Sequence, residues 1–400
     1  MLRKFINGLI SIGILVFMIS GTVYAAGQKT GIQEMTLDKA QKYAEEHNKT
    51  LRDLKDQCDD MEKTYNDMVS DTRKIQNVPD KVTFASMDEY ALHKGYTLEK
   101  TKYTYDELLK TKELTGQSTY YSIEKLAYEI DEAEKDLEYL RKTKAKLEKD
   151  YDIAHLKFKL EMINQTQLDQ AGTALSQINS KLKLMYDALI LKKNAQKTLL
   201  GIDRNVTLKI KINNKEFKEL GDINTDDLLE KAARNRLDTI QLTDSLNSIK
   251  MDYELYEHFK MNLGYDEYKD KKDAYEKEKE FYENDMLDIK QKVLDAYEAV
   301  ITSEKDYTVA LEAYNNTKEL HRVNELKYTL GMISLVDLMG SDLSFKQAEI
   351  DLEKALNKNI LANRKFEASY TIGEVETAGA AASASTTGSA SGTAQTSQGQ

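Results

Sequence analysis

The chain has little of what interrupts a helix. Its 400 residues include one proline, Pro79, and 18 glycines, and they include no tryptophan. A glycine-punctuated α/β enzyme and an all-β sandwich both need turn residues at short intervals, so the composition disfavours these two classes. Proline is the residue that a helix interior tolerates least, and its scarcity favours long helices.

The chain also has few of the residue patterns that form catalytic, metal-binding or nucleic-acid-binding sites. Cys58 is the single cysteine, which excludes an intrachain disulfide and any multi-cysteine metal site. The five histidines are scattered without metal-binding spacing, and no phosphate-binding glycine loop or nucleophile elbow is present. The formal net charge of −11 disfavours nucleic-acid binding, which needs a basic surface. We therefore expect no enzyme activity, no cofactor, no metal and no nucleic-acid partner.

Residues 1–25 have the layout of a secretory signal peptide. Arg3 and Lys4 precede an apolar run over 5–24, and Val23 and Ala25 form a small-residue cleavage pattern. An uncleaved membrane anchor is the alternative, because the run nearly reaches membrane-spanning length. We expect cleavage near Ala25 and export of the mature chain, which has no second apolar stretch of spanning length.

Four stretches carry apolar residues alternately three and four positions apart. They cover 51–75, 123–158, 168–189 and 335–355. Such a repeat keeps one seam of a helix facing a partner helix, as in a coiled coil. Cys58 falls on the first seam, and we expect it to pack there as a small apolar residue. Two looser helices are expected over about 226–260 and about 266–329.

The chain contains an internal duplication. Residues 155–168 (HLKFKLEMINQTQL) match 325–338 (ELKYTLGMISLVDL) at an offset of 170. Residues 44–50 resemble 232–238 at an offset of 188, so the first copy holds 18 more residues between these two points. Each copy predicts a long helical hairpin preceded by another helix. Two such units bury their seams against each other or against other subunits.

These patterns divide the chain into five parts. After the signal peptide, 26–204 form the first helical repeat, with an irregular insert over 78–116. Residues 205–225 form a connector, in which 205–213 (NVTLKIKIN) alternate apolar and polar residues like a short strand. Residues 226–373 form the second repeat. Residues 374–400 are rich in Ala, Ser, Thr and Gly and are expected to be a disordered tail.

Three segments of the sequence resemble a known protein family. The segment 328–373, the opening 35–40 (MTLDKA) and the run 160–203 resemble the corresponding parts of TolC-like outer-membrane efflux proteins. The resemblance covers about 35–373. It implies a mostly α fold of duplicated, long coiled-coil hairpins with at most a few short strands. It also implies a trimer whose hairpins form a tapered tube, with strands that close a twelve-stranded barrel in the outer membrane.

The resemblance also implies partners. In this family the tube docks an adaptor, or membrane fusion protein, which links it to an inner-membrane pump. The docking site would be the turns of the two hairpins: Leu330, Gly331, Met332, Ile333 and Ser334 in the second copy, and Leu160, Glu161, Met162, Ile163 and Asn164 in the first. A tight turn between helices often needs a left-handed residue, which explains Gly331 but not Glu161.

One region departs from the family pattern. A membrane strand needs about ten residues with alternating apolar side chains. The first copy offers only the short runs 81–84 and 102–105, and the second offers no strand over 258–275. We therefore expect no direct insertion into the membrane. Residues 81–116 would then form a polar loop or short helices that cap the tube.

Two functions follow as hypotheses. The first is an exported, oligomeric helical conduit of an efflux or secretion system, located in the outer membrane or at the cell surface. The second is an exported coiled-coil scaffold that keeps the fold without transport. A periplasmic adaptor ranks behind both, because it needs β-rich domains beside its hairpin and only 205–213 read clearly as strand. The mass of the assembled protein separates the first two hypotheses.

Overall fold

The computed structural model describes residues 32–76, 86–213, 215–221, 223–263 and 265–375. The expected signal peptide, the short run 81–84 and nearly all of the expected tail lie outside these residues. The described part is mostly helical, as the sequence predicts. None of its helices is long and apolar enough to cross a membrane.

The first half of the chain runs through six elements. Strand β1 (Ile32–Thr36) leads into α1 (Leu37–His47), and α2 (Lys49–Gln76) follows after one residue. The short α3 (Met87–His93) precedes two long helices, which form a hairpin. The two helices of this hairpin are α4 (Tyr96–Lys159) and α5 (Gln165–Leu199).

The second half repeats this order except for α3, which has no counterpart among the described residues. Strand β2 (Thr207–Lys211) pairs in parallel with β1 and confirms the strand expected over 205–213. The helices that follow are α6 (Thr225–Asn235), α7 (Leu237–Leu263), α8 (Tyr265–Thr329) and α9 (Leu335–Thr371). Helices α6 and α7 replace the single helix expected over about 226–260, because the backbone is extended at Arg236.

The helix boundaries locate the 18 additional residues of the first half. Helix α6 begins and ends 188 positions after α1, whereas α9 begins 170 positions after α5. Nineteen residues, 77–95, separate α2 from α4, and a single residue, 264, separates α7 from α8. The difference of 18 therefore lies at this one place, where α3 is found.

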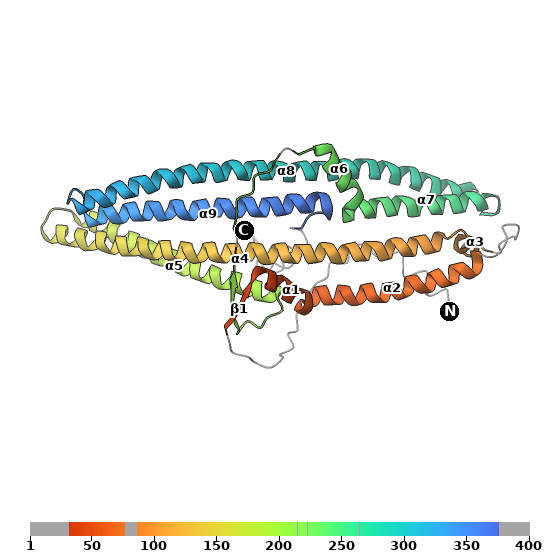
Figure 1. Cartoon of the computed structure of the whole chain (residues 1–400), viewed down its shortest axis with the longest axis horizontal. Coiled ribbons are helices and arrows are strands. Elements are labelled where there is room, and N and C mark those ends of the chain that lie inside the picture. The colour runs from red at the N-terminus through yellow and green to blue at the C-terminus, as the bar shows by residue number, and fades with distance from the viewer. Residues whose placement is uncertain (1–31, 77–85, 214, 222, 264, 376–400) are drawn as a thin grey trace, which may run out of the picture.

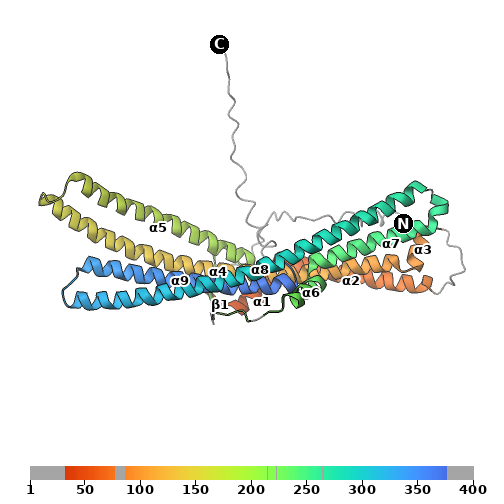
Figure 2. The ribbon, with the colours of Figure 1, turned by 90° about the horizontal axis from the view of Figure 1, so that it is seen from above.

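The helices form a twisted row. Toward one end of the molecule the order is α5, α4, α9, α8, and toward the other end it is α2, α4, α7, α8 (Figures 1 and 2). Helices α4 and α8 run through both parts. At about 1.5 Å per residue, their 64 and 65 residues extend over roughly 96 Å each.

The core is a series of small clusters along the row. Near the middle, β1, α1, β2 and the end of α5 bury Met35, Ala40, Ala44, Leu200 and Leu208. Along the first hairpin, Leu137 of α4 packs with Leu189 of α5, and both lie on predicted seams. Cys58 is buried as expected, with its thiol 3.8 Å from the carbonyl oxygen of Leu108.

The region expected to be irregular differs from the prediction. Residues 87–93 are helical, and 96–116 are the first turns of α4, so 102–105 are helix and not strand. The hydroxyls of Thr101 and Thr104 donate to the carbonyl oxygens four residues earlier, at 2.8 and 3.1 Å. Residues that usually favour strands are accommodated here because their polar groups are satisfied inside the helix.

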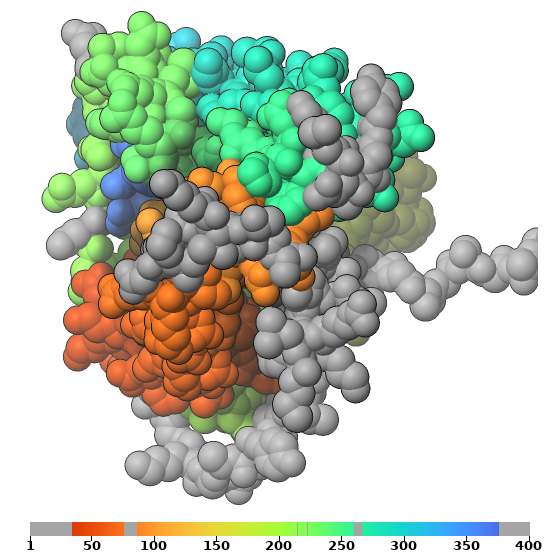
Figure 3. Space-filling model, turned by 90° about the vertical axis from the view of Figure 1, so that its right-hand side faces the viewer, coloured from red at the N-terminus to blue at the C-terminus, as the bar shows by residue number. Residues whose placement is uncertain are grey.

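At the end of the molecule that contains α3 and the start of α4, the first half contacts the second half (Figure 3). The ring of Tyr90 in α3 stacks on the ring of His258 in α7, with 4.1 Å between centroids. The hydroxyl of Tyr96 donates to Glu254 at 2.8 Å, and Lys100 pairs with Asp252 at 2.5 Å. Helix α3 and the start of α4 thus both join the first half to α7.

Candidate functional site

The turns of the two long hairpins lie at the same end of the molecule, opposite α3 (Figures 1 and 2). The first turn joins α4 to α5 through 160–164, and the second joins α8 to α9 through 330–334. All ten residues singled out from the sequence are therefore brought to one end. We call these two groups of five residues the first tip and the second tip.

The two tips have the same backbone hydrogen bonds. In the first, the amides of Glu161 and Met162 donate to the carbonyl oxygens of Phe158 and Lys157, both at 2.9 Å. In the second, Gly331 and Met332 donate to Tyr328 and Lys327 at 2.9 and 2.8 Å. This is the Schellman arrangement, which needs a left-handed residue directly after the helix.

That left-handed residue differs between the tips. The φ angle is 57° at Glu161 and 70° at Gly331. Among the described residues, Glu161 is the only non-glycine with a positive φ. A side chain in this conformation costs free energy that glycine avoids, so the first tip is strained where the second is relaxed.

Each tip ends in a capping box that starts the next helix. The side chain of Asn164 accepts from the amide of Gln167 at 3.0 Å, and that of Ser334 accepts from Asp337 at 3.2 Å. The side chains of Gln167 and Asp337 bond back to the backbone of the capping residue. Hydrogen bonds from the hydroxyl and backbone of Ser334 hold the pKa of Asp337 below its ordinary value. These reciprocal bonds fix the geometry of both turns.

The tips expose large apolar side chains. Leu160, Met162, Leu330 and Met332 are each between 61% and 68% exposed. Further exposed leucines extend the apolar surface along the adjoining helices, namely Leu156, Leu326 and Leu335. Exposed apolar side chains gathered at one end are typical of a surface that binds another protein.

The two hairpins differ in charge. Residues 141–199 hold 12 basic and 6 acidic side chains, whereas the equivalent residues 311–369 hold 8 basic and 9 acidic ones. The first hairpin is thus basic within an acidic protein. The two tips therefore have the same backbone geometry, but they belong to hairpins of different net charge.

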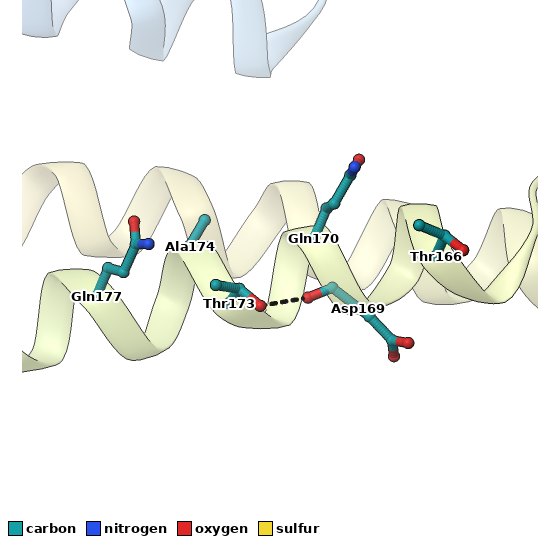
Figure 4. Close-up of a pocket in the computed structure, with 6 residues that line it drawn as sticks. All are labelled: Thr166, Asp169, Gln170, Thr173, Ala174 and Gln177. Carbon is teal, nitrogen blue, oxygen red and sulfur yellow. Dashed lines mark hydrogen bonds between the residues drawn. The ribbon is translucent and has the colours of Figure 1, made fainter.

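A shallow hollow of about 310 Å³ lies beside the first tip. It is lined by Thr166, Asp169, Gln170, Thr173, Ala174 and Gln177, which all belong to α5 (Figure 4). In the close-up the carboxylate of Asp169 points away from the side to which Gln170 and Gln177 point. A single helix supplies the whole lining, so the hollow encloses a ligand poorly and adds little to the tip.

A second groove, of about 460 Å³, lies between α4 and α7. Asp244 lines this groove and Glu107 lies next to it on α4; burial, followed by repulsion from Asp244, raises the pKa of Glu107 to about 7. Burial, followed by repulsion from Asp106 and Glu99, raises the pKa of Asp244 to about 6. Among the described residues no cluster of histidine, cysteine and carboxylate side chains is arranged to hold a metal ion.

The sequence did not single out the exposed faces of α5 and α8. Leu184 and Leu191 of α5 are both 70% exposed, and Val309 and Leu320 of α8 are 66% and 63% exposed. These two helices form the outer edges of the row at the end that carries the tips. The only signal for these faces in the sequence is that apolar residues also occur outside the seam of each helix. Periodicity alone cannot show whether such residues form a second contact face or are scattered by chance.

Comparison with known proteins supports the resemblance at the level of fold. No model of a protein family matches the chain, and no curated protein sequence matches it. The structure is similar to crystal structures of TolC-family outer-membrane channels. Identity with them is low, so the similarity establishes the fold and not the activity.

Three of these structures illustrate the extent of the match. CusC is 11% identical, with a TM-score of 0.61 over 88% of this chain and 96% of that one. The open state of the MtrE outer-membrane channel of Neisseria gonorrhoeae is 13% identical, with a TM-score of 0.60 over 85% and 89%. The outer-membrane protein VceC of Vibrio cholerae is 10% identical, with a TM-score of 0.58 over 84% and 95%.

Proposed function

We propose that this chain, which has the fold of TolC-like outer-membrane channels, is one subunit of an exported helical conduit in the cell envelope. The observation that carries the proposal is the extent of the match, at least 84% of this chain and 89% of each of the three channels described. Such a conduit would serve an efflux or secretion system. It would act passively, with passage controlled by how the hairpins pack.

Several copies are needed to build this conduit. One chain supplies a row of four helices, which has two free edges and encloses nothing by itself (Figure 2). Joining the free edges of identical copies closes a ring if the rotation between copies is suitable. We propose a trimer, as the family resemblance implies.

The two tips are the proposed docking site for an adaptor that connects to an inner-membrane pump. Apolar anchors surrounded by polar groups are the usual centre of a protein interface, and Leu330 and Met332 fit that role. The first tip has the same anchors, Leu160 and Met162, on a basic hairpin. It is therefore suited to a more acidic part of the partner surface.

The experiment is complementation of a deletion strain of the source organism. Export of a fluorescent efflux substrate would be measured with the wild-type chain and with Met332→Asp. A buried charge at the centre of an interface is costly, so we expect Met332→Asp to lose export while the protein still assembles. Met332→Leu is the matched control and should export normally. Normal export by Met332→Asp would overturn docking at the second tip.

The second candidate is an exported scaffold without transport. It is favoured by the end opposite the tips, where the two halves are joined by contacts between helices, including the stacking of Tyr90 on His258 and the pairing of Lys100 with Asp252. A scaffold predicts that deletion alters the envelope but leaves substrate export unchanged. Restoration of export by the wild-type chain would exclude this candidate.

A further inference from the structure

The groove between α4 and α7 lies away from both free edges of the helical row. At the end opposite the tips the order of the helices is α2, α4, α7, α8, so α4 and α7 are the inner pair (Figure 1). The groove has a volume of about 460 Å³. Sites for small molecules have volumes of about 300–1,000 Å³, so the groove has room for an organic ligand.

Carboxylates line the groove at regular intervals. Glu99, Asp106 and Glu113 recur every seventh residue along one face of α4, and Asp244 is contributed by α7. Seven residues of helix correspond to about 10.5 Å, so the carboxylates on α4 are about two turns apart. The groove therefore presents separate negative charges along its length.

The two outer carboxylates on α4 have partners within the same helix. Glu99 accepts a hydrogen bond from the hydroxyl of Tyr103 at 2.9 Å. Glu113 pairs with Lys110, with 2.9 Å between the carboxylate oxygen and Nζ. A partly exposed pair between neighbouring turns contributes little to stability, so a ligand cation can compete with Lys110 for Glu113.

The two middle carboxylates have no such partner. Asp106 and Asp244 form no ion pair or hydrogen bond with another residue that the structure describes. Burial and repulsion raise the pKa of Asp244 to about 6; the charged groups that act on it are Asp106 and Glu99, which raise the pKa, and Lys102, which lowers it. A cation between Asp106 and Asp244 would relieve their mutual repulsion.

The groove also has apolar side chains. Leu109, which is 38% exposed, lies between Asp106 and Glu113 in the sequence of α4, and Ile240 of α7 is a second apolar residue of the lining. An inorganic ion gains nothing from apolar surface. A hydrocarbon chain that links two positive charges would use both the carboxylates and the apolar side chains.

We propose that the groove between α4 and α7 binds a linear organic dication, such as an alkyl diamine or a polyamine. One ammonium group lies between Asp106 and Asp244, and the hydrocarbon chain covers Leu109 and Ile240. The second ammonium group reaches Glu113, about 10.5 Å along α4 from Asp106. This site goes beyond the proposed conduit and does not depend on it, because the whole groove belongs to one chain.

Calorimetric titration of the full chain with octamethylenediamine tests the site. At about pH 8 the amines keep their charge, since alkyl ammonium groups titrate near pH 10. We expect saturable binding that is about tenfold weaker in Asp244→Asn, which removes a charge at nearly constant size. Asp288→Asn is the matched control, because Asp288 is an exposed carboxylate of α8 outside the groove, and it should bind like the wild type. Unchanged binding in Asp244→Asn, or equal weakening in the two variants, would overturn the site.

The length of the ligand tests the role of the apolar side chains. Tetramethylenediamine carries the same two charges on a chain too short to join Asp106 and Glu113, so we expect it to bind at least about tenfold more weakly. Leu109→Ala should narrow this difference. Equal affinities of the wild-type chain for the two diamines would mean that charge alone is recognised, and so would equally effective displacement of octamethylenediamine by Mg²⁺. Either result would contradict the proposal.

The affinity should also depend on pH. Burial and repulsion from Asp244 raise the pKa of Glu107 to about 7, although a hydrogen bond from Gln241 acts against this rise. At about pH 5 both carboxyl groups are protonated while the diamine keeps its charge, so we expect binding at least about fivefold weaker than at about pH 8. An affinity that stays constant over this range would contradict binding beside Asp244.

Discussion

Arg236 and Ser369 are joined by a buried hydrogen bond, from Nη1 of the guanidinium to the carbonyl oxygen, at 2.6 Å. The first half contains the same contact, in which Nδ2 of Asn48 donates to the carbonyl oxygen of Leu199 at 2.8 Å. Asn48 and Arg236 both follow the first helix of their half, 188 positions apart, and the two acceptors are 170 positions apart. The last turn of each hairpin is thus anchored to the break between two helices.

Removal of Arg236 tests the strength of this anchor. Its side chain is fully buried and also binds both oxygens of Asp238, at 2.8 and 2.6 Å. We expect Arg236→Ala to lower the free energy of unfolding by about 1–3 kcal/mol, because the buried carbonyl oxygen of Ser369 loses its donor. Arg234→Ala, two residues earlier and exposed, should change it by less than about 0.5 kcal/mol. Urea denaturation followed by circular dichroism measures both, and equal losses would contradict the anchor.

We expect glycine to be the more stable residue at the left-handed position of both tips. Glu161 holds a left-handed conformation that glycine adopts without strain, so Glu161→Gly should stabilise the chain by about 1 kcal/mol. Gly331→Ala should destabilise it by about the same amount, since a Cβ there meets no atom within 4 Å and only backbone strain changes. Chemical denaturation of both variants is the measurement. A stability loss in Glu161→Gly would show that its side chain makes a compensating contact.

Gly201 should tolerate a side chain less well than Gly331. It is also left-handed, but a Cβ there would lie 2.6 Å from the carbonyl oxygen of His47. Steric overlap with backbone adds to the strain, so Gly201→Ala should cost at least about 2 kcal/mol. Gly331→Ala is the matched control in open space. Equal losses in the two variants would mean that the approach of α1 to the end of α5 is not tight.

The contact between α4 and α7 predicts a pH dependence of stability, because it partly buries the carboxyl groups of Glu107 and Asp244. The pKa of Glu107 is raised from 4.5 to about 7, and that of Asp244 from 3.8 to about 6. The folded chain therefore holds more protons than the unfolded chain between about pH 4 and 7, and this contribution to stability is lost as the pH rises through that window.

The free energy of unfolding would be measured by urea denaturation from about pH 4.5 to about pH 8, in steps of about one pH unit or less. Glu107→Gln should flatten the decline, because its side chain cannot ionise. Asp244→Asn should flatten the lower part and also lower the pKa of Glu107, by removing a like charge. An unchanged slope in Glu107→Gln would contradict the assignment.

The sequence predicted the hairpins because their seams are long and regular. The turns were located by the repeated Met-Ile segment, and all ten residues lie at one end. The start of α4 was not predicted, since Thr and Tyr favour strands locally while the structure satisfies Thr101 and Thr104 within the helix. The exposed edges could not be predicted either, because they depend on which helices lie side by side.

The mass of a chain that begins at Ala26, the start expected after cleavage of a signal peptide, tests most directly whether this protein assembles by itself. Light scattering with and without mild detergent would measure it in solution. We expect a stable oligomer of three copies, in which the free edges of the helical row are joined. A monomer under every condition would contradict a self-assembled conduit.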